Sequence, residues 1–157
     1  MRPGVRIGVD VGTARIGLAR CDFHGMIATP VETVPRDRDG GTSDIARIVA
    51  VVAELGAVEV VAGLPLALSG NRTASTDDAV RFAEALAWSL DVPVRLVDER
   101  LSTVSAQSAL RASGRKARTH RPVIDQVAAT IILQHALDSE RASGKPPGSF
   151  VLPTERP

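Results

Sequence analysis

The chain has 157 residues, of which 44% are hydrophobic and 24% are charged, and its formal net charge is +1. These values are typical of one globular domain, and any contact with nucleic acid would have to come from local basic patches. An aromatic content of 3% without any Tyr argues against a protein that stacks bases on rings, and Cys21 alone allows neither an internal disulfide nor a thiolate zinc site. Because no apolar stretch is long enough to span a bilayer and no signal peptide is evident, we expect a cytoplasmic protein without a membrane partner.

The first third of the sequence predicts three strands. Residues 5–10 and 14–20 are predicted to form two strands of a hairpin joined through Gly12, and residues 26–34 the third strand. Pro30 favours an edge position for the third strand, because proline lacks the N–H that an inner strand must donate.

The following residues predict alternating helices and strands. The expected elements are a helix over 43–55, a strand over 58–62, a helix starting near Ser75 with Asp78 as capping partner, a strand over 93–99, a helix over 103–112 and a last helix from Pro122 to about residue 140. This order predicts an α/β fold with a mixed five-stranded sheet and helices on its faces. We expect a single domain over residues 1–141 and a disordered, proline-rich tail over 142–157.

Three carboxylates stand at the ends of predicted elements. Asp10 ends the first strand, Glu99 follows the last strand, and Asp125 lies in the first turn of the last helix. A buried carboxylate without a partner costs several kcal/mol, so each of them needs one. If the three converge, a divalent cation would offset their repulsion, and hard oxygen ligands without His or Cys suit Mg²⁺ or Mn²⁺. Such a site can activate water and hydrolyse a phosphodiester.

Simpler explanations remain open for two of these acids. Asp10 can accept hydrogen bonds from the backbone of the Gly12–Thr13 turn. Asp125 can complement the positive end of its helix dipole without any catalytic role.

The third acid also has an alternative. Glu99 can form an ordinary ion pair with Arg95 or Arg100, and chemistry alone does not decide between Asp98 and Glu99 as the functional residue. Neighbouring strand residues project to opposite sides, so we expect only one of the two to face Asp10.

Basic side chains near these elements could bind substrate phosphates. An arginine fork suits phosphate oxygens, although a run of basic residues is more often a solvated turn. The candidates are Arg15, Arg72 and Arg100, and in the basic loop Arg115, Lys116 and Arg118.

Four segments together resemble the YqgF family of bacterial proteins. They are residues 7–19, 61–70, 98–106 and 124–134, in the family's order and with similar spacing. The resemblance implies a ribonuclease H-like fold and a nuclease site in which Asp10, Glu99 and Asp125 bind two metal ions. Residues 66–69 read Leu-Ala-Leu-Ser where many members carry Asn-Met-Asp-Gly, which weakens any role for side chains of that loop.

The expected function is therefore metal-dependent cleavage of structured nucleic acid, with 5′-end processing of pre-16S rRNA as the first hypothesis. The alternative substrate is a Holliday junction in branched DNA, for which a homodimer would supply two sites. A sugar-kinase or actin-like ATPase also begins with Asp-x-Gly-Thr, but that fold needs two such domains. A binding module with a decayed site is a further alternative, although all three carboxylates are present.

Overall fold

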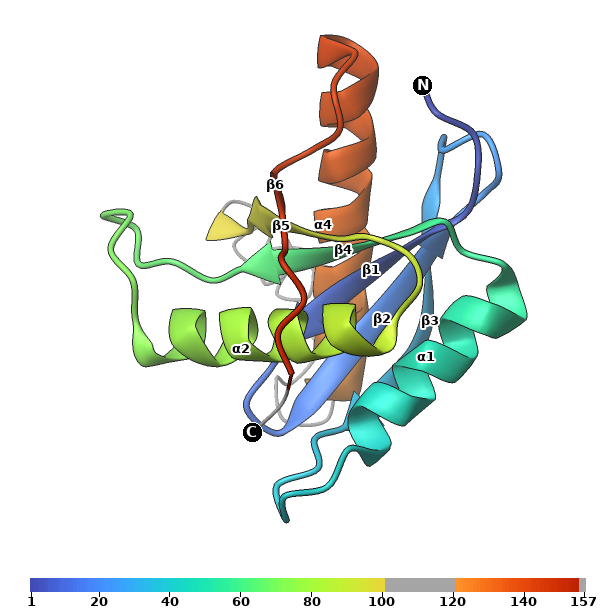
Figure 1. The fold of residues 1–157 in the computed structure, drawn as a ribbon. Helices are drawn as coiled ribbons and strands as arrows, with labels where there is room; N and C mark the ends of the chain where they lie inside the picture. The colour runs from blue at the N-terminus through green and yellow to red at the C-terminus, as the bar shows by residue number, and fades with distance from the viewer. Residues whose placement is uncertain (101–120, 156–157) are drawn as a thin grey trace.

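The computed structural model describes residues 1–100 and 121–155 (Figure 1). For residues 121–123 it describes the backbone alone. One six-stranded sheet has the strand order β3-β2-β1-β4-β5-β6. The predicted helix over 103–112 and the basic residues Arg115, Lys116 and Arg118 lie outside the described part of the chain.

The antiparallel half of the sheet consists of the first three strands. They are β1 (Arg6–Val11), β2 (Arg15–Cys21) and β3 (Ala28–Pro35), paired as successive hairpins. The predicted meander is confirmed, and β3 lies at the sheet edge as Pro30 indicates.

The parallel half continues from β1 through β4 (Glu59–Leu64) to β5 (Val94–Asp98). Helices α1 (Ser43–Leu55) and α2 (Ala74–Ser89) cover one face of the sheet, and α4 (Arg121–Ser143) crosses the other face (Figure 1). The α/β class and the mixed sheet with helices on both faces are thereby confirmed.

The C-terminal segment differs from the expected disordered tail and accounts for the sixth strand. Strand β6 (Ser149–Phe150) pairs antiparallel with β5, and the N–H of Val151 donates to the carbonyl of Val94 at 2.9 Å. Val151 is 5% exposed and belongs to the hydrophobic core. Proline content indicated disorder, but one buried valine and a short strand hold this segment against the sheet.

The two predicted helix boundaries that rest on capping give different outcomes. Helix α1 ends at Gly56 in the left-handed conformation with φ 60°, as expected. Helix α2 starts one residue earlier than predicted, because Thr73 and Thr76 form the capping box instead of Ser75 and Asp78.

The two faces of the sheet have different side chains. Ile7 and Val9 of β1 pack toward α1 and α2 in the larger core cluster. Successive strand residues point to opposite faces, so Gly8 and Asp10 face α4. A Cβ at Gly8 would lie 2.8 Å from the Ala129 carbonyl oxygen, which shows how closely α4 approaches the sheet.

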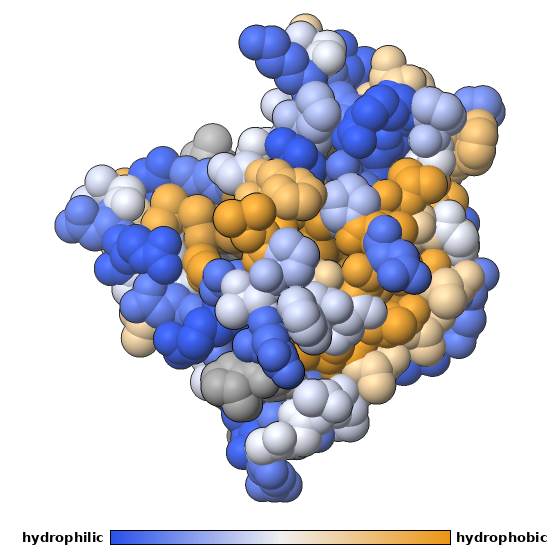
Figure 2. Space-filling view, viewed as in Figure 1, coloured by the Kyte–Doolittle hydropathy of each residue, from blue (hydrophilic) through white to orange (hydrophobic). Residues whose placement is uncertain are grey.

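The outer surface is mixed in character. Figure 2 shows hydrophilic residues at the projecting loops and ends of the molecule, with apolar surface between them. In the described ranges, none of the helices combines the length and the hydrophobicity needed to cross a membrane.

Candidate active site

The position of Asp125 beside Asp10 follows from the strand register. Asp10 on β1 pairs with Gly17 on β2, and a Cβ added at Gly17 would collide with the backbone of Asp125. Glycine at this position therefore lets the start of α4 lie directly on the sheet next to Asp10. The structure brings the acid of the first strand and the acid of the last helix together, which the sequence left open and the family resemblance implied.

Glu99 reaches the same place from the other side of β1. Strand β4 pairs with β1 at Val9–Ala62, so Gly63 lies one position further toward Asp10. A Cβ at Gly63 would overlap the Glu99 carboxylate and lie 2.8 Å from Cδ1 of Ile132. The missing side chain thus creates the space in which the Glu99 carboxylate rests.

The Asp10 and Glu99 side chains are hydrogen-bonded to each other. Burial and the charge of Asp125 raise the pKa of Asp10, and burial and the charge of Asp10 raise the pKa of Glu99. Two ionised carboxylates in direct contact repel each other, so a proton or a cation between them is favoured. Glu99 is 8% exposed.

One oxygen of this pair has no partner. Among the described residues, Oε2 of Glu99 is a buried side-chain oxygen without a hydrogen bond. Buried carboxylate oxygens are normally satisfied, so this atom marks a place for a ligand with positive charge or a donor.

Asp125 has a different environment from the other two acids. Its Oδ2 accepts a hydrogen bond from Nε of Arg15 at 3.0 Å, and the two side chains are 17% and 33% exposed. Burial raises the pKa of Asp125, while the Arg15 guanidinium opposes that rise. Within residues 1–100 and 124–155, no three His, Cys, Asp or Glu side chains are arranged as a ready metal cage.

Glu99, and not Asp98, is the side chain that faces Asp10, as the alternation of strand residues predicts. The Asp98 side chain is 43% exposed and forms an ion pair with Arg100 at 2.6 Å, while Glu99 turns inward. Arg95 donates to the carbonyl of Gly148 at 3.2 Å and to that of Pro147. Neither arginine pairs with Glu99 in the described structure, so the simple ion-pair explanation for Glu99 is wrong.

The three predicted binding arginines that the structure describes all have carboxylate partners. Arg15 pairs with Asp125, and Arg72 pairs with Asp77 at 2.7 Å. Arg100 pairs with Asp98 and also donates to the Leu68 carbonyl at 3.2 Å, so it holds the loop after β4. Only Arg15 among them lies against the acids, and it lines a cavity of about 310 Å³ with Thr13 and Asp125.

Two features of the site escaped the sequence analysis. The first is the pair Gly17 and Gly63, whose signal was present, because an isolated glycine within a strand indicates a close approach. The second is Arg36, which donates to the Gly12 carbonyl at 2.9 Å and to both oxygens of Asp78. Nothing near Arg36 in the sequence indicates these distant partners.

Comparison with known proteins identifies the family. The profile of RuvX, described as Holliday junction resolvase, matches residues 4–139. The chain belongs to the RuvX family. Its relatives include proteins named "Putative pre-16S rRNA nuclease" from Clavibacter michiganensis, 68% identical over 96% of this chain and 93% of that protein, and from Leifsonia xyli, 63% identical over 98% and 97%.

Solved structures support the fold of this RuvX protein. The structure titled "T. thermophilus RuvC in complex with Holliday junction substrate" has a TM-score of 0.57 at 18% identity and covers 94% of this chain and 99% of that one. This likeness establishes the ribonuclease H-like fold. The family match also confirms the resemblance to YqgF proteins and disfavours the sugar-kinase or actin-like ATPase.

Proposed function

We propose that this RuvX protein is a metal-dependent endonuclease whose site consists of Asp10, Glu99 and Asp125, and that it processes the 5′ end of pre-16S rRNA. The relatives named for that reaction cover nearly the whole chain. The observation that carries the proposal is the Asp10–Glu99 pair, in which Asp10 is half-buried, Glu99 is buried and one Glu99 oxygen lacks a partner among the described residues.

The residues fit a divalent cation of the Mg²⁺ or Mn²⁺ type. Three carboxylates supply hard oxygen ligands, and a cation bound between Asp10 and Glu99 would offset the repulsion that raises their pKa values. When bound, such ions activate water and stabilise charge at a phosphodiester. The pocket over Gly63 holds the Glu99 carboxylate in a fixed orientation for this purpose.

Arg15 and Asp125 provide the part of the site that must rearrange. In the structure described here Asp125 is neutralised by Arg15 at 3.0 Å. A substrate phosphate is a better partner for the arginine fork than a partly exposed carboxylate that a cation can share. We expect Arg15 to transfer from Asp125 to a phosphate oxygen, which frees Asp125 to join Asp10 and Glu99.

The second candidate substrate is a four-way DNA junction. The family description and the ribonuclease H-like fold shared with RuvC favour it. Symmetrical cleavage of a junction needs two sites related by a two-fold axis, so this alternative predicts a homodimer. Arg72, Arg100, Arg115, Lys116 and Arg118 remain proposed contacts to either nucleic acid.

The test is cleavage of two substrates by the purified protein. A pre-16S rRNA 5′ segment and a four-way junction are each incubated with Mg²⁺, Mn²⁺ or EDTA. We expect metal-dependent cleavage of the rRNA segment at a defined position and a loss of about 10³-fold or more in Asp10→Asn, because the acids act on the reacting phosphate together.

Asp91→Asn is the matched control, since Asp91 is an exposed aspartate outside the site. It should cleave like the wild type. Equal cleavage by Asp10→Asn would refute the site. Preferential cleavage of the junction by a dimer would show that the substrate is branched DNA.

A further inference from the structure

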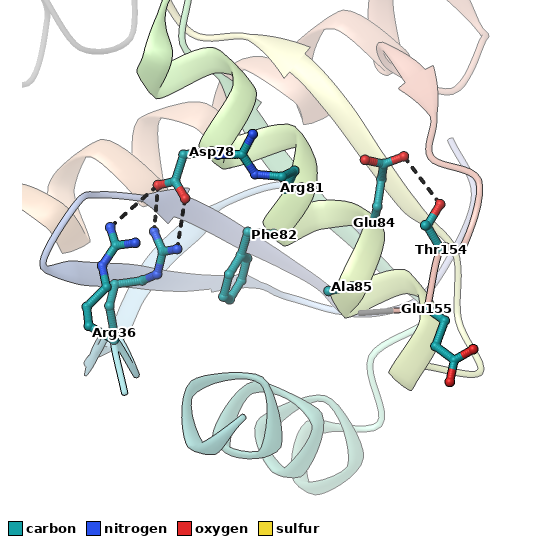
Figure 3. A pocket seen from close by; sticks show the side chains of 9 residues that line it. Arg36, Asp78, Arg81, Phe82, Glu84, Ala85, Thr154 and Glu155 are labelled. Carbon is teal, nitrogen blue, oxygen red and sulfur yellow. Dashed lines mark hydrogen bonds and ion pairs between the residues drawn. The ribbon is translucent and has the colours of Figure 1, made fainter. Parts of the chain in front are cut away.

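A second cavity lies on the opposite face of the sheet from α4. It has a volume of about 490 Å³ and is lined by α2, by the segment after β3 and by the end of the chain. In Figure 3 Arg36 reaches Asp78 at one end of this cavity, while Glu84, Thr154 and Glu155 lie at the other end. The two ends therefore differ in charge.

Arg36 lies buried at the bottom of the basic end of the cavity. Its side chain is 5% exposed, and its two terminal nitrogens donate to the two oxygens of Asp78 at 2.8 and 3.0 Å. Its guanidinium also lies 5.0 Å from the centre of the Phe82 ring and forms an ion pair with Asp44 at 3.7 Å. Both Asp78 oxygens are thus engaged before any other arginine approaches.

Arg38 and Arg81 add positive charge to that of Arg36, which already pairs with Asp78. Arg38 is 51% exposed and comes no closer to Asp78 than 3.7 Å. Arg81 is exposed, and among the described residues no carboxylate lies within ion-pair distance of it. All three guanidiniums act on the Asp78 carboxylate, whose two oxygens are already bonded to Arg36, so Arg38 and Arg81 keep N–H donors for a further anion.

The basic end of the cavity is connected to the candidate active site through one turn. Arg36 donates to the Gly12 carbonyl, and Arg38 donates to the Thr13 carbonyl at 3.0 and 2.5 Å. The same turn lines the cavity that contains Arg15 and Asp125. Thr13 lies three residues after Asp10, which is about 10 Å of extended chain, so one nucleic-acid strand can reach both places.

We infer that Arg38 and Arg81 bind a backbone phosphate of the substrate at a distance from the phosphodiester that is cleaved. Arg36 is a positioning residue that fixes Asp78 and the turn. Glu84 and Glu155 repel the backbone from the far end and so direct it along the Gly12–Thr13 turn. The inference rests on the proposed function in taking nucleic acid as the ligand.

The experiment measures binding without cleavage. Fluorescence anisotropy with a labelled pre-16S rRNA 5′ segment in EDTA gives the affinity at several salt concentrations for wild type, Arg38→Gln/Arg81→Gln and Arg47→Gln. Loss of one phosphate contact should reduce the slope of log affinity against log salt by about 0.7 to 0.9. We expect an affinity about tenfold lower near 0.1 M salt.

Arg47→Gln is the matched control, because Arg47 is 43% exposed and lies on α1 away from the cavity. It removes one positive charge outside the cavity and should keep the wild-type slope. A double variant with the slope of Arg47→Gln would overturn the inference, and thermal unfolding verifies that all three proteins are folded.

The outcome separates the two proposals. If the wild type does not cleave with Mg²⁺ but the double variant loses salt dependence, the phosphate site stands and the nuclease assignment fails. If the wild type cleaves and the double variant binds with an unchanged slope, only the phosphate site fails.

Discussion

The two ends of the sheet each hold a pair of acids, but the charges that surround the two pairs are opposite in kind. At the end where the chain begins, Glu59 and Glu140 are 1% and 4% exposed. Arg2 donates to both oxygens of Glu59 at 3.1 Å and also bonds Glu140, and Arg6 donates to Glu140 at 3.3 Å. Every acid at this end has a cation.

At the other end Asp10 and Glu99 interact with each other instead of with an arginine. Their charges repel each other and their pKa values are raised, and an oxygen of Glu99 is left without a partner in the described structure. We propose that the compensated end contributes to stability and that the other end is kept for a ligand. Uncompensated acids are typical of functional sites, whereas compensated ones tie elements together.

The largest expected loss of stability comes from disrupting the ion pairs at the compensated end. Replacing Arg6 by Met leaves Glu59 and Glu140 buried with one cation fewer, so we expect the free energy of unfolding to fall by about 3–5 kcal/mol. Urea denaturation measures it. Arg47→Gln, which removes an exposed ion pair with Glu32, should cost less than about 1 kcal/mol. Similar losses in the two variants would contradict the structural role of the Arg6 network.

A smaller loss of stability is expected when a side chain fills the space above Gly63. In Gly63→Ala the new Cβ overlaps the Glu99 carboxylate, and we expect a loss of about 1–3 kcal/mol in stability. Truncating Glu99 to Ala should remove part of that loss, so a double-mutant cycle isolates the contact. Additive effects of the two substitutions would show that Glu99 does not lie over Gly63.

A third effect is a dependence of stability on pH at the uncompensated end. Folding raises the pKa values of Asp10 and Glu99, so the folded state binds more protons than the unfolded state above about pH 4. Without metal, the free energy of unfolding should therefore fall as pH rises from about 5 to about 8.

Asp10→Asn provides the comparison for the pH effect, because it removes one of the two titrating groups. Its stability should fall less with rising pH in thermal melts recorded in EDTA. A wild-type protein whose stability rises over this range would show that the pair does not hold a proton.

The sheet and the acids were largely predictable because they follow from local patterns. The alternation of β1 places Asp10 on the α4 side, and Asp98 and Glu99 must diverge at the end of β5. The family resemblance then indicated which three acids belong together. That Gly17 and Gly63 make the space for Asp125 and Glu99 depends on strand register, which sequence spacing does not give.

Contacts between distant residues were not predictable for the same reason. The approach of Arg36 to Asp78 depends on how the segment after β3 meets α2. The β6 strand was missed because proline content outweighed the short stretch around Val151.

The most direct test of the difference between the two ends is metal binding measured by thermal unfolding near pH 8. For the wild type, Mg²⁺ or Mn²⁺ at about 100 times its dissociation constant should stabilise the protein by about 2.7 kcal/mol, which raises the melting temperature by about 5–10 °C. Asp10→Asn and Glu99→Gln should show no such rise, and Asp91→Asn should show all of it. An equal rise in Asp10→Asn would mean that the cation binds elsewhere and that the Asp10–Glu99 pair is not a metal site.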